Sequence, residues 1–280
     1  MQPNIKRVYF LRVVFATMKF NLIAHYRVFR ALSFLMRFFM PLLSIGTAWI
    51  LYNKVFHGQI SSEFGQFAYT DYLTFVIVGN AVFIYIYAGV FVTGRTMFFA
   101  RMQGILDPLF LTPMSRVGYM MGSVLMGVLD STVDFLVLLG VGLLFGIQLS
   151  SMNVTVFLTG LFMTLLALFG VGMVVNGVTL TLRDQINTAN FLQTILYTFS
   201  GVVVPVEMMP GWAQAVSSLS PLTYGLRIVR GSLRSGVVLS DFSYEFKVLI
   251  VMSVVLLFIG VFFLKAIEKN LKKSSKLTVI

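Results

Sequence analysis

The chain has 280 residues, of which 58% are hydrophobic and 11% are charged, and its formal net charge is +11. Soluble globular domains contain about twice as many charged residues, so this composition excludes that class and indicates a membrane protein with several spans. The absence of cysteine excludes disulfide bonds and thiolate metal sites. We therefore expect an all-α membrane protein that forms a single domain over residues 1–280.

Residues 1–37 are expected to form a basic helix that lies in the cytoplasmic interface of the membrane. If residues 5–35 are helical, four basic side chains recur at intervals of seven, eleven and seven residues and share one side of the helix: Arg12, Lys19, Arg30 and Arg37. These charges interrupt any apolar run of the length that a signal peptide needs, so we expect the stretch to be retained. An irregular basic leader is the alternative.

Six apolar segments are long enough, or nearly so, to cross a hydrocarbon layer of about 30 Å with roughly 20 residues each. The third and fourth are longer than a span requires, so we expect them to tilt or to project into the cytoplasm. The six segments are Phe38–Phe56, Tyr72–Thr93, Val117–Phe145, Val154–Leu182, Ala189–Val206 and Phe246–Ile267.

Lysine and arginine gather on one side of these spans, and basic loops tend to stay in the cytoplasm. Sixteen of the 21 basic residues fall in the leader, in the loops after the second and fourth spans, and at the C-terminus. We therefore expect a multi-pass plasma-membrane protein with both termini cytoplasmic. The polybasic ends are expected to contact anionic membrane lipids, and we expect no nucleic-acid partner.

Candidate catalytic groups are too few for an enzyme. His25 and His57 are the only histidines, and the predicted topology puts them on opposite sides of the membrane, so we expect neither a catalytic residue nor a metal site. No lysine follows a glycine, as a phosphate-binding loop would require. Nucleotide-driven work must therefore be done by another polypeptide.

Between the second and third spans, residues 95–116 form a connection that is too long for a simple turn. Residues 104–111 can form a short amphipathic helix with Ile105, Leu109 and Phe110 on its apolar side. This helix ends at Pro113, because the residue before a proline is pushed out of the helical region. A helix of this kind could receive force from a cytoplasmic partner. The alternative is a loop that packs against its own helices.

The stretch Ser200–Gly231, called the broken segment below, is apolar but contains Pro205, Pro210 and Pro221. Prolines remove backbone donors and stop helices, so this stretch must consist of short pieces. Unpaired backbone is tolerated at membrane depth only beside protein or a water-filled cavity. The broken segment therefore indicates a transporter, and we expect residues 205–245 to form an external, re-entrant region.

Asp130 and Asp134 lie one helical turn apart in the third predicted span, so both side chains face the same direction. A charge at this depth costs about 2.5 to 3.5 kcal/mol, and such groups normally face protein or water. Several interpretations stay open. The aspartates are protonated, pair with a polar group such as Asn80 or Asn176, line the substrate path, or lie nearer the interface.

Aromatic and small residues also recur at helical spacing. Phe83, Tyr87 and Phe91 repeat every four residues in the second span; such a stripe commonly faces lipid or packs against protein, and a place in the substrate path is the alternative. Two glycine pairs in the third span permit close helix approach: Gly118 with Gly122, and Gly142 with Gly146.

Three arginines follow Pro221 at helical spacing: Arg227, Arg230 and Arg234. We expect them to share one side of a short external helix. In one interpretation this side binds anionic lipid or a substrate head group. In the other, the arginines only extend into the interface and have no transport role.

Three motifs, taken together, carry a resemblance to a known family. The first is Gly104-Ile-Leu-Asp-Pro-Leu-Phe-Leu-Thr-Pro-Met-Ser-Arg116, and the second is Leu182-Arg-Asp184, after the fourth span. The third is Pro205–Arg230, with Trp212 and the string Ser220-Pro-Leu-Thr-Tyr224. Their order and predicted sidedness resemble the type-2 ABC transporter (ABC-2) permeases, the transmembrane subunits of ABC exporters, over essentially the whole chain.

The resemblance implies a half-transporter that pairs with a second permease subunit as a homodimer and works with two ABC ATP-binding subunits. Those subunits would bind ATP and Mg, and this chain would bind no cofactor. ATP-driven closure would tilt the two permeases and move an amphiphilic substrate outward, either a drug-like compound, a lipid or a lipid-linked glycan. Coupling to the ATPase would involve Gly104, Leu106, Leu109, Leu111, Thr112, Pro113, Arg116, Arg183 and Asp184. The external gate would involve Pro205, Pro210, Trp212, Pro221, Tyr224, Arg227, Arg230 and Arg234.

Two other functions stay open at this point. One is a proton- or ion-coupled secondary transporter in which Asp130 and Asp134 are the coupling pair, and the other is a membrane scaffold without transport activity. A secondary transporter should have broken helices at matching places in two related halves. Here the helix breakers concentrate after the fifth predicted span, which favours the ABC interpretation.

Overall fold

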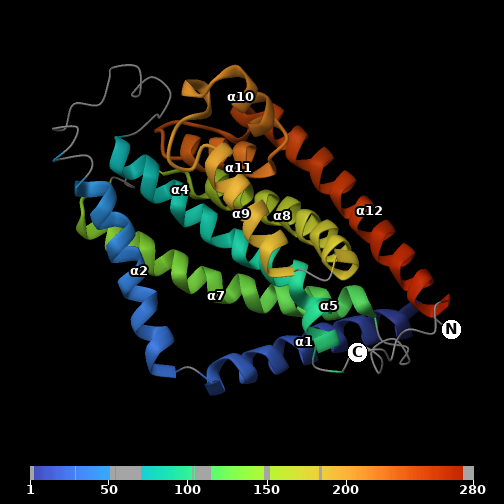
Figure 1. Ribbon diagram of the computed structural model, residues 1–280. Helices are drawn as coiled ribbons and strands as arrows, with labels where there is room; N and C mark the ends of the chain where they lie inside the picture. Colours follow the sequence, from blue (N-terminus) through green and yellow to red (C-terminus); the bar gives the residue numbers. More distant parts are fainter. Residues whose placement is uncertain are drawn as a thin grey trace.

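The computed structural model describes residues 3–28, 30–50, 54, 71–102, 104, 115–147, 152–182 and 185–273. All regular elements in these residues are helical, and no strand occurs among them (Figure 1). The prediction of an all-α protein is confirmed.

Four helical stretches of the described chain are long and apolar enough to cross a membrane: Tyr72–Val92, Val117–Leu144, Val154–Val178 and Leu239–Phe263. The elements that carry them are α4 (Tyr72–Ile86) with the π-helix η2 (Tyr87–Val92), α7 (Arg116–Leu144), α8 (Val154–Leu182), and η4 (Leu239–Phe242) with α12 (Ser243–Lys273). They match the second, third, fourth and sixth predicted spans. The first and fifth predicted spans overlap α2 (Arg30–Ile50) and α9 (Gln185–Phe199), and their crossing stays a prediction.

The N-terminal region forms two helices, α1 (Pro3–Val28) and α2, which run in different directions in Figure 1. Arg12 and Lys19 are exposed on α1. Arg30 and Arg37 belong to α2, so the expectation of one helix with all four basic residues on one side is wrong. The reason is the helix boundary after Val28, which the regular spacing of the charges does not reveal.

The first glycine pair of the third predicted span holds α1 against α7. A Cβ on Gly118 would lie 3.3 Å from the Phe10 ring, and one on Gly122 would lie 2.5 Å from the Val14 carbonyl oxygen. Asn21 Nδ2 also donates to Ser123 Oγ at 3.0 Å across this contact. The close approach that these glycines permit is therefore made within one chain.

The two glycines of the second pair have different structural roles. A Cβ on Gly142 would lie 3.0 Å from Ile77 on α4, so this glycine permits close packing of α7 on α4. Gly146 follows the end of α7 with φ 90°, a left-handed conformation that favours glycine. Only the first of these two residues makes a helix contact.

Helix α8 lies at the centre of the bundle and contacts α11 (Pro221–Gly231), α12, η2 and α5 (Thr93–Met102). A Cβ on Gly170 would lie 2.8 Å from Leu256 Cβ, so α12 lies close along α8. Fully buried aliphatic side chains from α4, α8 and α11 fill the core: Ile77, Ile86, Leu168, Leu222 and Leu226. Part of the broken segment is thus built into the core.

The second predicted span contains the π-helix η2, which the sequence did not indicate. Gly172 of α8 has no room for a Cβ because the Gly89 carbonyl of η2 lies against it. Asn176, one turn further along α8, donates from Nδ2 to the Thr93 carbonyl at 2.6 Å, just after η2. Side chains that insert at a helix distort its hydrogen-bond ladder, and single-turn π-helices commonly mark such places.

The broken segment forms η3 (Val206–Met208), α10 (Gly211–Ser218) and α11. Pro205 and Pro210 directly precede the first two helices, and Pro221 is the first residue of the third, where a missing N–H donor costs nothing. The prediction of short pieces bounded by prolines is confirmed. In Figure 1, α10 lies at the top of the view, whereas α1 and α5 lie at the bottom.

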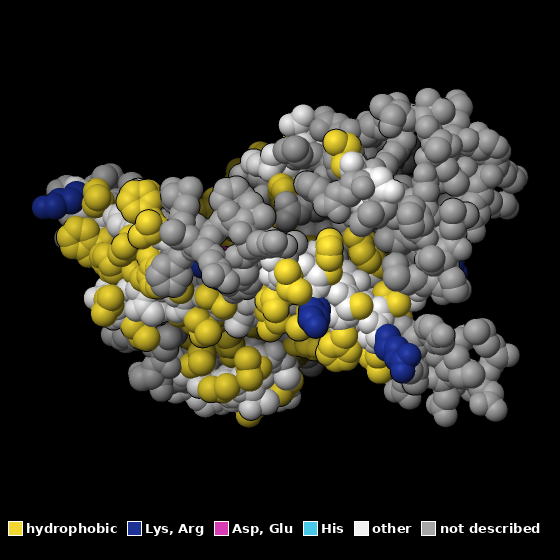
Figure 2. All heavy atoms as spheres, turned by 90° about the horizontal axis from the view of Figure 1, so that it is seen from below, with side chains coloured by type: hydrophobic (Ala, Val, Ile, Leu, Met, Phe, Trp, Pro, Cys, Tyr) yellow, Lys and Arg dark blue, Asp and Glu magenta, His cyan; other side chains and the backbone are white. Residues whose placement is uncertain are grey.

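Apolar side chains cover much of the described surface. Figure 2 shows hydrophobic side chains over most of the coloured area on the side seen from below, interrupted by a few lysine and arginine side chains. Few residues of the Leu239–Phe263 stretch are buried, whereas most of Tyr72–Val92 is buried. α12 is therefore a peripheral helix, whereas α4 is an inner one.

Candidate functional site

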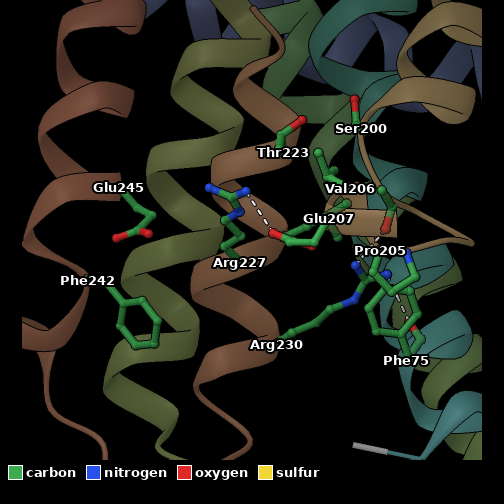
Figure 3. A pocket seen from close by; sticks show the side chains of 12 residues that line it. Phe75, Ser200, Pro205, Val206, Glu207, Thr223, Arg227, Arg230, Phe242 and Glu245 are labelled. Atoms are coloured by element: carbon green, nitrogen blue, oxygen red, sulfur yellow. Dashed lines mark hydrogen bonds and ion pairs between the residues drawn. The ribbon is translucent and has the colours of Figure 1, made fainter. Parts of the chain in front are cut away.

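A pocket of about 300 Å³ opens within the broken segment and beside the start of α12. Figure 3 shows side chains of both charges around it. The lining comes from α4, from the turn after α9, from η3, and from α11, η4 and α12: Phe75, Ser200, Gly201, Pro205, Val206, Glu207, Thr223, Leu226, Arg227, Arg230, Phe242 and Glu245. The pocket is where the external-gate candidates and the core meet.

Arg230 forms the inner wall of this pocket and is only 6% exposed. Its Nη1 donates to the Gly201 carbonyl at 2.6 Å, and its Nη2 donates to the carbonyls of Val202 at 2.7 Å and Phe75 at 3.0 Å. The guanidinium carbon lies 3.4 Å from the centre of the Phe75 ring, as a cation–π contact requires. Arg230 thereby ties α11 to α4 and to the turn after α9.

The chain makes room for this buried cation through Gly79 on α4. A Cβ at Gly79 would overlap both Nη2 of Arg230 and the Val202 carbonyl oxygen. Burial lowers the pKa of Arg230 to about 9, while the Glu207 carboxylate raises it, so the side chain stays a cation at neutral pH. A buried cation normally needs such partners, because an unpaired one is very costly.

The expectation that the three arginines share one side of a short helix is wrong. Arg230 points into the core, and Arg234 lies beyond the end of α11. Arg227 is the partly exposed member, with 39% of its side chain accessible, and its Nη2 donates to Glu207 Oε1 at 2.8 Å. Helical spacing applies to Arg227 and Arg230, but it does not reveal which of the two packs into the protein.

Hydrogen bonds hold the other gate candidates in place. Ser200 Oγ and Ser220 Oγ are 2.6 Å apart and join the end of α9 to the start of α11 at Pro221. Tyr224 is buried, and its hydroxyl donates to the Ser218 carbonyl at 3.1 Å. Trp212 is exposed on α10 and packs edge to face on Phe199 with 5.6 Å between ring centres. These contacts make the broken segment a packed cap.

The aspartates of α7 meet an arginine from α2. Arg37 Nη2 forms an ion pair with Asp130 Oδ1, and Arg37 Nε lies 3.4 Å from Asp134 Oδ1. Pairing was one expected outcome, but the cation that provides it is 93 residues away from Asp130 in the sequence. The side chain of Asp134 is 36% exposed and that of Asp130 is 13% exposed, so Asp130 is the more enclosed of the two aspartates.

The two asparagines proposed as partners for the aspartates have other bonds. Asn80 Nδ2 donates to the Val76 carbonyl at 2.9 Å, and its Oδ1 accepts from the Tyr197 hydroxyl at 3.4 Å. Asn176 donates to Thr93, as described above. Neither forms a hydrogen bond to Asp130 or Asp134 among the contacts described, because an arginine takes that place.

The aromatic candidates for the substrate path differ from one another. Phe83 is half-buried and packs edge to face on Tyr197 with 4.7 Å between ring centres. Tyr87 is exposed in η2 and stacks on Phe91 with 6.1 Å between ring centres. Their place in a substrate path stays a prediction.

A comparison with known families now bears on this arrangement. Residues 12–233 match the family model described as ABC-2 type transporter. The chain belongs to the ABC-2 type transporter family. It is therefore the membrane subunit of an ABC transporter, a permease and not the ATPase.

Curated relatives of this ABC-2 permease include the probable doxorubicin resistance ABC transporter permease protein DrrC from two strains of Mycobacterium tuberculosis. The chain is 26% identical to each over 149 residues, which is 50% of this chain and 51% of the relative. The chain thus spans about half the length of the curated relatives it matches.

Most of the predicted coupling segment of this ABC-2 permease lies outside the described residues: Leu106, Leu109, Leu111, Thr112, Pro113, Arg183 and Asp184. Gly104 has φ 70°, a left-handed conformation that favours glycine. Arg116 is the first residue of α7, whose N-cap Ser115 accepts from the Gly118 N–H at 3.1 Å. The coupling role of all nine residues stays a prediction.

Nine of the twelve pocket residues were not among the predicted site residues of this ABC-2 permease, including Phe75, Glu207 and Glu245. A signal was present for Glu207, because it is the single acidic residue of the broken segment, which also contains two arginines. Glu245 resembles an ordinary acidic residue in the first turn of a helix, where negative charge is favourable. Nothing in the sequence marked Phe75 as a pocket residue, since phenylalanine is common in apolar helices.

Proposed function

We propose that this chain is the permease half of an ATP-driven exporter that moves an amphiphilic molecule outward across the plasma membrane. Two copies of the chain work with two ABC ATP-binding subunits, which bind and hydrolyse ATP with Mg. The chain crosses the membrane six times, with α2 and α9 as the first and fifth spans and both termini in the cytoplasm. The family assignment supports an ATP-binding partner subunit. The sequence of this chain also has no phosphate-binding loop, so we infer that another subunit binds ATP.

The observation that carries the proposal is the packed cap at one end of the bundle. Short helices interrupted by prolines lie against the core through α11, and backbone at membrane depth is tolerated where protein or a cavity surrounds it. We assign this end to the outside, where α10 and α11 are a re-entrant gate. Arg230 and the Ser200–Ser220 contact hold the gate to the bundle.

Two observations support the proposed substrate class. The printed name of the curated relatives refers to doxorubicin resistance, which suggests that a permease of this kind handles drug-like amphiphiles. The chain itself offers a largely apolar interior with few polar groups, which suits a substrate with a large apolar part. A drug-like compound, a lipid or a lipid-linked glycan fits this description.

The secondary-transporter alternative has less support. A coupling carboxylate must gain and lose its proton or ion during each cycle, but Asp130 and Asp134 both have Arg37 as a cationic partner. This arrangement suits a structural link between α2 and α7. We therefore expect transport to need ATP and not an ion gradient.

The test is coupled transport by the chain with its ATP-binding subunit in liposomes. Leu109→Glu and Arg116→Glu should leave membrane insertion intact and abolish ATP-dependent export, because they change the segment that receives force from the ATPase. Lys247→Glu is the matched control, since this exposed charge lies in the first turns of α12, next to the predicted external region.

Three results would contradict the proposal. The first is undiminished ATP-dependent export by the Leu109→Glu and Arg116→Glu variants. The second is transport that a proton gradient alone drives. The third is purification of the chain from its native membrane without an ATP-binding subunit in equal amount.

A further inference from the structure

The pocket at the start of α12 holds hydrogen-bonding capacity that the protein does not use. Two arginines and two glutamates line it, so their formal charges cancel: Arg227, Arg230, Glu207 and Glu245. Groups whose donors and acceptors already have protein partners form the wall of the pocket, whereas groups with unused donors or acceptors can contact a ligand.

Arg230 belongs to the wall. Both Nη groups donate to backbone carbonyls, and its Nε is buried and has no hydrogen-bond partner among the described residues. Because this side chain is only 6% exposed, a ligand in the pocket meets its charge through the wall and not by direct contact.

Glu245 is the group with unused acceptors. It lines the pocket from the first turn of α12 and is half-buried, and its carboxylate has no hydrogen bond or ion pair within the described part of the chain. An ionised carboxylate offers about four acceptor positions. The helix N-terminus favours its negative charge. The acceptors of Glu245 are therefore available to a ligand that donates hydrogen bonds.

Arg227 is the group with unused donors. One of its Nη groups donates to Glu207 at 2.8 Å, whereas a guanidinium carries five N–H donors. Figure 3 shows the Arg227 guanidinium with Glu207 on one side and Glu245 on the other. Donors of Arg227 and acceptors of Glu245 thus border the same space from two helices, α11 and α12.

A ligand that carries both a negative and a positive group complements this arrangement. We propose that the pocket binds the zwitterionic head group of an amphiphile, whose phosphate accepts hydrogen bonds from Arg227 and whose primary ammonium donates to Glu245. A purely anionic or cationic head group satisfies only one side of a pocket whose charges cancel. Charge-assisted hydrogen bonds of this kind are the strong ones.

The volume of the pocket and the residues next to it are consistent with binding of a lipid head group. A volume of about 300 Å³ lies at the lower end of ligand sites, so the pocket takes a head group but leaves the apolar tails outside. Exposed apolar residues lie farther along α12, on the face turned away from the bundle: Val251, Val254 and Phe258. The tails of the amphiphile then lie outside the pocket, in the membrane. The use of this head group as substrate rests on the proposed function, whereas its binding does not.

The test is binding of lipids with identical acyl chains to the purified full chain in detergent, measured by native mass spectrometry. Phosphatidylethanolamine should bind more tightly than phosphatidylglycerol, which lacks the ammonium. Glu245→Gln should weaken phosphatidylethanolamine by about tenfold or more, the loss of one charge-assisted hydrogen bond, and leave phosphatidylglycerol unchanged. Arg227→Gln should weaken both lipids. Lys247→Gln, on the same helix outside the pocket, should change neither.

Folding is checked by thermal unfolding of each variant. If Glu245→Gln does not fold, Glu245→Asp keeps the charge but withdraws it by one methylene, and it should bind phosphatidylethanolamine with intermediate affinity. Free phosphoethanolamine should bind much more weakly than the lipid, because the tails contribute. Equal affinity of the free head group would overturn the assignment to an amphiphile.

Two further outcomes separate this inference from the proposed function. Equal binding of phosphatidylethanolamine and phosphatidylglycerol, or unchanged binding by Glu245→Gln, would overturn the head-group site even if ATP-dependent export is observed. Glu245-dependent binding of phosphatidylethanolamine by a chain that exports nothing would uphold the site and contradict the proposed function.

Discussion

Replacement of Arg230 by methionine tests whether the buried guanidinium holds the cap to the bundle. The substitution keeps a long side chain but removes the donors that the Gly201 and Val202 carbonyls use. Two buried acceptors without partners cost about 1 to 3 kcal/mol each, and the lost contact with the Phe75 ring costs about 2 kcal/mol. The variant no longer bears the cost of burying a cation, so the net loss should be about 3 kcal/mol.

The assay is thermal unfolding of the detergent-solubilised chain, followed by tryptophan fluorescence. Trp212 packs on Phe199 beside the turn that Arg230 binds, and Trp49→Phe leaves it as the single reporter. A loss of about 3 kcal/mol lowers Tm by about 6 to 12 °C in a protein of this size. Arg230→Lys keeps the charge on a compact donor and should lose about half as much.

Lys247→Met is the matched control, because this exposed cation should change stability by less than about 0.5 kcal/mol. An Arg230→Met variant that melts at the wild-type temperature would show that the three carbonyl contacts carry no net stability. The cap would then be held by the hydrophobic packing of α11 on α8 alone.

Three further substitutions test contacts inside the bundle. Gly79→Ala should lower Tm by the equivalent of about 1 to 3 kcal/mol, since its methyl group would overlap the buried guanidinium; an unchanged Tm would mean that the cation has room to move. Asp130→Asn should reduce the yield of folded protein in size-exclusion chromatography more than Asp134→Asn, because Asp130 is the more enclosed partner of Arg37; the reverse order would contradict this. Asn176→Leu leaves the Thr93 carbonyl without its bond at 2.6 Å, and amide hydrogen exchange of η2 should speed up; unchanged exchange would show that Asn176 does not support the π-helix.

The sequence predicted best the features that depend on local chemistry. Proline placement fixed the starts of η3, α10 and α11 within the broken segment, because a missing N–H donor acts on its own helix whatever surrounds it. Apolar runs likewise identified the four long stretches that include α4, α7, α8 and α12.

Features that depend on contacts between distant helices were not predictable. The spacing of Arg227 and Arg230 placed them on a similar side of α11, but only the position of α4 decides that Arg230 enters the core. The partner of Asp130 comes from a helix 93 residues earlier, and no local pattern singles out Arg37 among the basic residues of the leader. The π-helix η2 likewise reflects the approach of α8 at Gly172.

The contact between Arg37 and the aspartates of α7 also sets an order for biogenesis. An arginine within an apolar helix costs about 2.5 to 3.5 kcal/mol to insert, and its carboxylate partner is 93 residues away in the chain. At about 5 to 20 residues per second, the ribosome takes about 5 to 20 s to synthesise that interval. We expect α2 to stay at the membrane surface or beside the insertion machinery for this time, and to settle in the bundle only when α7 arrives.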